Sequence, residues 1–420
     1  MLKLAFRGVL RYKKRTIITA FAISMAILFS IFMQTLLTGI QYDSNKNLIW
    51  NDTSSAKIYA PGYFEDRENL PIDKLITKEQ GQQLEQILDA NGFENYTKEF
   101  ISSCQIIFYE DPFITSGSLY AQIRALDSDN LDAYNFKDAQ IEGKWLSKNV
   151  DGIVIGANLA NDINAELNYY VTIQTKGKGG FIQAFDIPII GIISSGDPII
   201  DATAIFFDLN TIDDYLELEG SSSSYAISYS SNIKKVETIS TSNTQKISSL
   251  IKEIDLKAYS WAEIAEDILN LQAADSGFTY IFLFFTFIIS VVGISNTMLM
   301  SVSERSNEIA MLKTLGYTNK YIRQLFTLEG TIIGIFGIVV GFILGIGVSL
   351  YFQNVGIDIS SWITSNESIG YRINSVMHAF ISYDEILIIL LLGLLVSIMS
   401  AYFSVRRTGR GEIAQLFRKL

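Results

Sequence analysis

Four long stretches of this chain contain no charged residue, and each is long enough to cross a lipid bilayer. They begin near Thr16, Phe278, Thr331 and Ile386, and a spanning helix needs about 20 apolar residues. One such stretch alone also fits a helix buried in a soluble core, and the first also resembles a signal peptide. Four together indicate a membrane protein, and we expect the first stretch to be retained. The predicted transmembrane helices are 16–40, 278–303, 326–352 and 386–405.

Basic residues gather beside alternate ends of these stretches. They cluster at 1–15, 304–325 and 406–420, whereas the segment 353–385 contains only Arg372. Cytoplasmic segments of membrane proteins carry an excess of Lys and Arg. We therefore predict that both termini and the segment 304–325 are cytoplasmic, and that 353–385 is a short outer loop.

The segment 41–277 is then an outer domain, and it is acidic. It holds 36 Asp and Glu against 17 Lys and Arg, and it is long enough to bury a core of its own. Its ends mix helical and strand patterns, such as a helix within 76–93, while its middle alternates short β-rich runs with turns. The predicted fold class is a four-helix membrane domain with a large α+β extracytoplasmic domain of two lobes. The β-rich lobe is expected at about 105–210.

The chain lacks the motifs of an enzyme that powers transport by itself. There is no G-x-x-x-x-G-K-[ST] phosphate loop and no G-x-S-x-G motif. A single cysteine, Cys104, and a single histidine, His378, exclude an internal disulfide and a Cys/His metal site, and their roles stay open. The centres of the predicted spans carry no ionisable residue of the kind that ion-coupled transporters use. We predict no catalytic site, metal or cofactor in this chain, so any energy must come from another chain.

Small residues recur on one face of each of the last two predicted spans. Such faces allow helices to pack closely, either within this chain or against a second membrane subunit, and the spacing leaves both alternatives open. The residues predicted to act in helix packing are Gly330, Gly334, Gly337, Gly341, Gly345, Gly393, Ser397 and Ser400.

The segment between the second and third spans has the pattern of a short amphipathic helix. Gly316 is placed to end it, and Thr318 to cap the next helix. A helix lying on anionic lipid favours Lys and Arg, yet this one begins with acids. A protein partner therefore fits this helix better than a lipid surface does. The residues predicted to dock that partner are Glu304, Arg305, Glu308, Ile309, Leu312, Lys313, Leu315 and Gly316.

The FtsX-like permease domain of ABC transporters closely resembles this chain over one long run, GISNTMLMSVSERSNEIAMLKTLGYTNKYIRQLFTLEGTIIGIFGIVVGFILG. The order of one span, a large outer domain and three spans is similar to the MacB/LolC/LolE layout. The run YSWAEIAEDI before the second span is most similar to the lipoprotein-releasing LolC/LolE branch. The chain departs from that branch at Leu167–Tyr170, where a Gly-Asp pair is usual.

This resemblance implies a permease subunit in a bacterial inner membrane. It implies two copies of a cytoplasmic ATPase, which bind ATP and Mg, and a second permease in a homodimer or heterodimer. Segment 304–316 would be the coupling helix, and movement would be transmitted to the outer domain. In the LolC/LolE branch a lipoprotein cargo passes to a periplasmic carrier. The alternatives are MacB- or DevC-like export with a periplasmic adaptor, and an FtsX-like regulator of cell-wall hydrolases.

Overall fold

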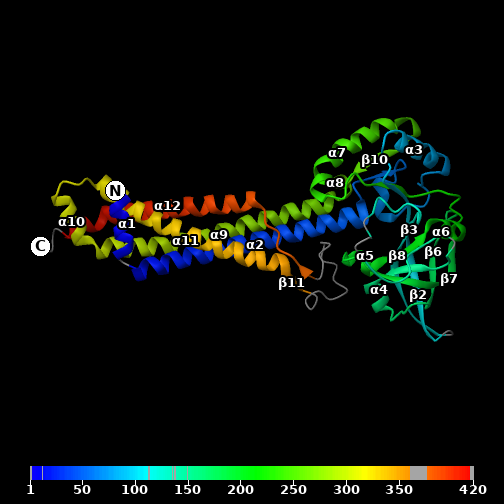
Figure 1. Cartoon of the computed structure of the whole chain (residues 1–420), viewed down its shortest axis with the longest axis horizontal. Coiled ribbons are helices and arrows are strands. Elements are labelled where there is room, and N and C mark those ends of the chain that lie inside the picture. Colours follow the sequence, from blue (N-terminus) through cyan, green and yellow to red (C-terminus); the bar gives the residue numbers. More distant parts are fainter. Residues whose placement is uncertain are drawn as a thin grey trace. The chain divides into compact units, whose positions relative to one another are not determined.

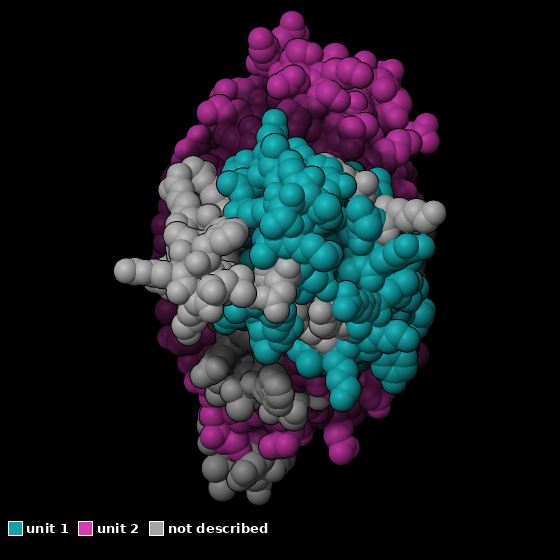
Figure 2. Space-filling model, turned by 90° about the vertical axis from the view of Figure 1, so that its left-hand side faces the viewer, with its two compact units in different colours: residues 1–41, 272–357, 377–420 teal, residues 42–271, 358–376 magenta. Residues whose placement is uncertain are grey.

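The computed structural model divides the chain into two compact units (Figure 2). Unit 1 comprises residues 1–41, 272–357 and 377–420, and unit 2 comprises 42–271 and 358–376. Parts of the expected outer loop (360–375) and tail (417–420) lie outside the described residues. The structure describes residues 2–11, 13–111, 114–134, 136, 139–148, 150–359 and 376–416.

Unit 1 is built from helices, and four of the described helices are long and apolar enough to cross a membrane. The candidate spans lie within 16–53, 266–304, 319–355 and 383–403, so three of these helices extend well beyond the predicted apolar stretches. The extensions are polar, which is why hydropathy alone did not include them. The helices of unit 1 are α1 (Leu2–Arg11), α2 (Lys13–Leu48), α9 (Glu266–Glu304), α10 (Ser306–Thr314), α11 (Asn319–Val355) and α12 (Tyr383–Leu416) (Figure 1). The final turns of α2 and the first turns of α9 belong to unit 2.

Branched apolar side chains form the core of unit 1. Ile27 and Ile31 of α2 are almost fully buried, together with Met298 of α9, Ile333 of α11 and Ile389 of α12. These residues share one face of each helix, whereas the opposite faces expose large apolar side chains. Apolar surface facing outward is the arrangement expected of helices surrounded by lipid.

Unit 2 is organised around one sheet of ten described strands. The order is β10-β1-β9-β2-β3-β8-β5-β7-β4, and β6 pairs with both β2 and β7. The pairs β3–β8 and β5–β7 are parallel, and the other ladders are antiparallel. The predicted fold class, four apolar helices with a large mixed helix and strand domain, is thus confirmed.

The bounds of the unit 2 elements follow the chain order. The strands are β1 (Ala56–Tyr59), β2 (Tyr96–Asp111), β3 (Ile114–Leu126), β4 (Gln140–Gly143), β5 (Ile153–Gly156), β6 (Tyr170–Lys176), β7 (Ile182–Ser194), β8 (Ala204–Asp208), β9 (Ser224–Ile227) and β10 (Lys257–Ser260). The helices are η1 (Ile49–Thr53), η2 (Phe64–Asn69), α3 (Lys78–Ala90), α4 (Ala157–Asp162), α5 (Pro198–Thr203), α6 (Leu209–Leu216), α7 (Ile233–Leu250), η4 (Lys252–Ile254) and α8 (Trp261–Ile264). Two short strands, β11 (Ile357–Asp358) and β12 (Val376–Met377), lie between α11 and α12 in the chain.

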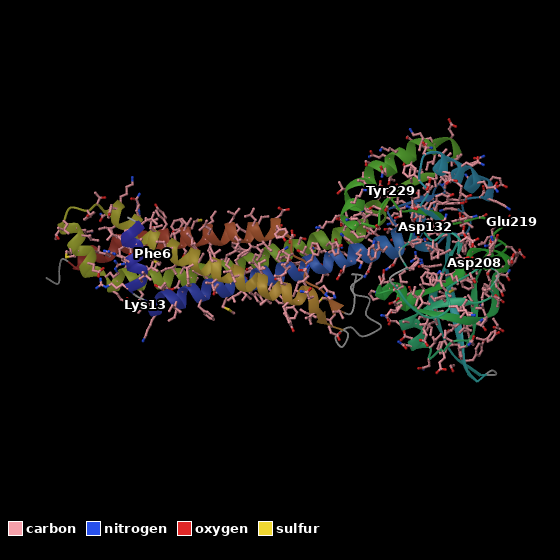
Figure 3. The ribbon with its side chains drawn as sticks, viewed as in Figure 1. Phe6, Lys13, Asp132, Asp208, Glu219 and Tyr229 are labelled. Carbon is pink, nitrogen blue, oxygen red and sulfur yellow. The ribbon has the colours of Figure 1, made fainter. Side chains whose placement is uncertain are left out.

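Several apolar cores lie along this sheet. Both ends of the outer segment supply one core, in which Ile58 and Leu84 pack with Ile227 and Ile247. Tyr229 adds a hydrogen bond to Thr244 of α7 in this region (Figure 3). Strands β2 to β8 supply most of another core. Because β9 pairs with both β1 and β2, the two lobes share one sheet, and the boundary expected near residue 105 falls inside β2.

Candidate functional site

The segment between α9 and α11 forms a short helix with a defined beginning and end. The helical run breaks at Arg305, and α10 then spans Ser306–Thr314. Gly316 has a φ of 89°, its N–H donates to the Lys313 carbonyl, and the Tyr317 N–H donates to the Leu312 carbonyl. This is the Schellman ending, in which glycine takes the left-handed conformation. Thr318 then caps α11 by accepting from the Tyr321 N–H, so α10 is held between two fixed turns.

A network of ion pairs joins α10 to its neighbours at the break. The Arg305 Nη1 lies 2.8 Å and 2.7 Å from the two carboxylate oxygens of Glu329 on α11. Its Nε donates to Glu308 at 2.7 Å, and Glu308 also accepts from Arg11 at 2.6 Å. The hydrogen bond from Arg305 is the main reason why the pKa of Glu308 is lowered. The network therefore ties α1, α10 and α11 together through two acids and two guanidinium groups.

Close packing places this network at the surface of α1. A Cβ added to Gly8 would lie 2.3 Å from Oε1 of Glu329 and 3.3 Å from Nη1 of Arg305. The Arg305 guanidinium also lies 4.9 Å from the ring centre of Phe326. Glu329 is 3% exposed, so its charge depends on Arg305 for compensation. Glycine at position 8 is what lets α1 approach the pair.

The outward surface of α10 differs from the face that the spacing predicts. Ile309 is buried against Val302, Ile322, Phe326 and Val405. Arg305 and Glu308 are engaged in the network, while Leu312 and Lys313 are half-buried. Glu304 is exposed at the end of α9. The large apolar side chains that reach solvent are Met311, Leu315 and Tyr317, which are 60%, 67% and 41% exposed.

The residues predicted from the sequence therefore include two that point inward, and they do not include the exposed Met311 or the buried Glu329. Arg305 and Ile309 belong to the packing of unit 1. Met311 was missed because it lies off the acid-led face, and Glu329 because it begins an apolar span. An acid at that position is itself a signal, since an ionisable group beside a span needs a partner.

The glycines of α11 lie at close helix contacts within this chain. A Cβ on Gly330 would lie 2.5 Å from the Ala401 Cβ of α12, and one on Gly334 would lie 2.5 Å from the Ser397 Cβ. Further along, a Cβ on Gly341 would lie 2.6 Å from the Ser24 carbonyl oxygen of α2. Gly330 and Gly334 thus lie against α12, and Gly341 lies against α2. Both of these helices run beside α11 (Figure 1).

The other predicted packing residues behave in the same way. Cβ atoms on Gly337 and Gly345 would approach Ile23 and Ile31 of α2, and one on Gly393 of α12 would lie 2.7 Å from Ile27 Cδ1. Ser400 of α12 lies 3.0 Å from the Ser295 hydroxyl of α9 and donates to the Val291 carbonyl. The Ser397 hydroxyl donates within its own helix to the Gly393 carbonyl. Small side chains at these positions therefore serve contacts between helices of one chain.

Unit 2 holds a buried charge cluster that the sequence did not reveal. The Lys57 Nζ of β1 lies 2.5 Å from Glu99 of β2, whose carboxylate also accepts from Tyr134 and Ser224. Arg124 of β3 lies 3.9 Å from Glu99 and 3.4 Å from Asp52. Glu99 is fully buried. No local pattern predicts such a cluster, because its members are far apart in the sequence.

Among the described residues, neither Cys104 nor His378 belongs to a group of side chains that could bind a metal ion. Cys104 is buried in the sheet core, and burial raises the pKa of its thiol to about 12. The His378 Nδ1 lies 3.1 Å from the Gln353 carbonyl oxygen. Within the described residues, no group of three or more His, Cys, Asp or Glu side chains is arranged to hold a metal ion.

Comparison with known proteins relates the chain to one family of permeases. Residues 280–413 match the family described as FtsX-like permease C-terminal. An uncharacterised ABC transporter permease of Methanocaldococcus jannaschii is 22% identical over 96% of this chain and 93% of its own length. The lipoprotein-releasing system transmembrane protein LolE of Haemophilus influenzae is 23% identical over 30% of this chain and 31% of its own length. The macrolide export ATP-binding/permease protein MacB of Wolinella succinogenes is 26% identical over 24% of this chain and 16% of its own length.

Proposed function

Because this chain is an ABC transporter permease of the FtsX, MacB and LolE type, we propose that it transmits ATP-driven movement from a separate cytoplasmic ATPase to its outer domain. Two copies of the ATPase would bind ATP and Mg, and this chain would pair with a second permease subunit. Both termini would lie in the cytoplasm of a cell whose inner membrane holds the complex. The basic segments at 1–15, 304–325 and 406–420 support that orientation.

The observation that carries this proposal is the exposed apolar surface of α10. Met311 lies on this helix, and Leu315 and Tyr317 flank the Gly316 turn that ends it; all three side chains are exposed. The helix is fixed at its beginning by Arg305 and at its end by Gly316. A rigid helix can transmit a push from a partner into the helices that hold it, whereas a flexible loop would absorb it. The Arg305–Glu329 ion pair connects the beginning of α10 to α11, so a displacement of α10 would also displace α11.

The docking role is tested with the double substitution Met311→Ala/Leu315→Ala. Both side chains are exposed, so the fold should be preserved while the partner loses its apolar contact. We expect ATPase binding to weaken by at least about thirtyfold, because the loss of even one central interface side chain costs about 2 kcal/mol. Met300→Ala is the matched control, since Met300 is 58% exposed on the preceding helix. Equal co-purification of the ATPase with the double variant and the control would refute docking at α10.

For the cargo, we propose release of lipoproteins from the inner membrane to a periplasmic carrier. The similarity to LolE supports this reading, and the similarity to MacB supports export with a periplasmic adaptor to the same degree. An FtsX-like regulator of cell-wall hydrolases is the third candidate, supported by the family match alone. Depletion of the chain distinguishes the three. Lipoproteins retained in the inner membrane support release, loss of resistance to an exported compound supports export, and a defect in wall cleavage alone supports regulation.

A further inference from the structure

A cavity of about 420 Å³ opens between the first turns of α11 and the far part of α12. None of its described lining residues belongs to the Arg305 network or to the exposed residues Met311, Leu315 and Tyr317. Its lining residues are Lys320, Arg323, Gln324, Thr327, Leu328 and Tyr402.

The polar end of this cavity is positively charged. Lys320 and Arg323 line it, and none of the other described lining residues is acidic. Within the described part of the chain, neither cation lies within ion-pair distance of a carboxylate. The Arg323 guanidinium lies 5.3 Å from the ring centre of Tyr402, which holds it in place without neutralising it. The N-terminus of α11, whose backbone dipole favours anions, begins one residue before Lys320.

The other end of the cavity is apolar and continues along a helix face. Leu328 lines the cavity, and Ile335, two turns further along α11, is 46% exposed. Val339, one turn beyond, is 48% exposed. Tyr402 lies at the end of the candidate span 383–403. The cavity therefore sits where the apolar part of two spans ends, with cations on one side and exposed apolar surface on the other.

We propose that this cavity binds the headgroup of an anionic phospholipid. The phosphate would contact Lys320 and Arg323, and an acyl chain would lie along Leu328 and Ile335. Basic pockets between transmembrane helices are known to suit anionic headgroups. A bound headgroup would hold the first turn of α11, which follows directly from the Gly316 turn that ends α10. The site does not depend on the proposed docking of an ATPase.

The test is lipid retention by the purified full chain in mild detergent, with phosphatidylglycerol or phosphatidylcholine added and bound lipid counted by native mass spectrometry. The wild type should retain one phosphatidylglycerol per chain in preference to phosphatidylcholine. Lys320→Ala/Arg323→Ala should lower that retention by about thirtyfold, because each of the two cations near a lipid surface contributes about fivefold to binding. Lys320→Arg/Arg323→Lys should keep it.

The control is Lys13→Ala/Lys14→Ala, which removes the same charge from the exposed beginning of α2 (Figure 3). Its retention should match that of the wild type, and the thermal unfolding temperatures of all four proteins should agree. Equal loss of bound lipid in the two double alanine variants would mean that lipid binds by general charge, and would overturn the proposal. Displacement of the lipid by millimolar inorganic phosphate would show a site for soluble phosphate instead. Unchanged lipid retention with loss of a co-purifying protein would show that the cations serve a protein surface, and would also overturn it.

Discussion

Arg305 and Glu329 face each other across the junction of α10 and α11, with Nη1 of the arginine 2.8 Å and 2.7 Å from both oxygens of the carboxylate. Twenty-four positions separate them in the chain, and Glu308 and Arg11 extend the contact to α1. The helix α10, for which the sequence predicts a docking role, is therefore also held to α1 and α11 by ion pairs. Its charged residues hold the helix in position, and its apolar residues remain available for a partner.

Glu329→Gln should destabilise the chain more than Glu308→Gln does. The first change leaves the buried Arg305 charge poorly compensated, at a cost of about 3 kcal/mol, the lower end of the usual range because Glu308 still faces it. The Glu308 side chain is 33% exposed, so its loss should cost less than about 1 kcal/mol. Thermal unfolding of the purified chain in detergent measures both. Equal unfolding temperatures for the two variants would show that the buried Arg305–Glu329 pair stabilises the chain no more than the partly exposed Arg305–Glu308 pair does.

Gly341→Ala should loosen the contact between α2 and α11. The added Cβ would lie 2.6 Å from the Ser24 carbonyl oxygen and 2.9 Å from the Ile27 Cβ, so backbone must move. Overpacking of this kind costs about 1–3 kcal/mol. Gly347→Ala is the control on the same helix, because a Cβ there meets nothing within 4 Å and alanine favours a helix. A lower unfolding temperature for Gly347→Ala than for Gly341→Ala would contradict the packing described here.

Glu99→Gln should destabilise unit 2 strongly. It removes the negative charge that compensates Lys57 and Arg124, which are 2% and 1% exposed. Breaking a buried ion pair in this way costs about 3–5 kcal/mol. Glu219 (Figure 3) pairs with Lys178 at the surface, and Glu219→Gln should change the stability little because solvent screens that pair. If proteolysis of the outer domain proceeded at the same rate in both variants, the buried cluster would not be the stabilising feature.

Stability of unit 2 should fall between pH 4 and pH 7 because of Asp201. Burial raises the pKa of Asp201 to about 6, even though its carboxylate accepts hydrogen bonds from the Ser195 N–H and hydroxyl. The unfolded chain has a pKa near 3.9 for this group, so the native state binds the proton more tightly. The resulting stabilisation, about 3 kcal/mol, is present below pH 4 and is lost as the pH rises through 6. Asp201→Asn should flatten this part of the curve of unfolding temperature against pH, and an unchanged slope would assign the dependence to other groups.

Features set by neighbours along the chain could be predicted from the sequence. The apolar runs are long enough to require membrane-crossing helices, and all four appear. The Gly316 turn, the Thr318 cap and the helix Lys78–Ala90 appear as predicted, because caps and helical periodicity depend on residues within one or two turns. The sequence by itself thus determined where the four apolar helices and the helix Lys78–Ala90 lie, and where α10 ends.

Only the tertiary structure decided which side chains face inward. Glu308 meets Arg11, which lies 297 positions away, and Ile309 turns toward Val405. Glu99 collects partners from three separate segments. A helical pattern gives the faces of a helix but not its rotation against its neighbours, and that rotation sets which charges are compensated and which apolar groups stay exposed. For this reason the sequence located the short helix α10, which we predict to dock a partner, whereas the exposed apolar residues in and after it, Met311, Leu315 and Tyr317, emerged only from the packing of α1, α10 and α11.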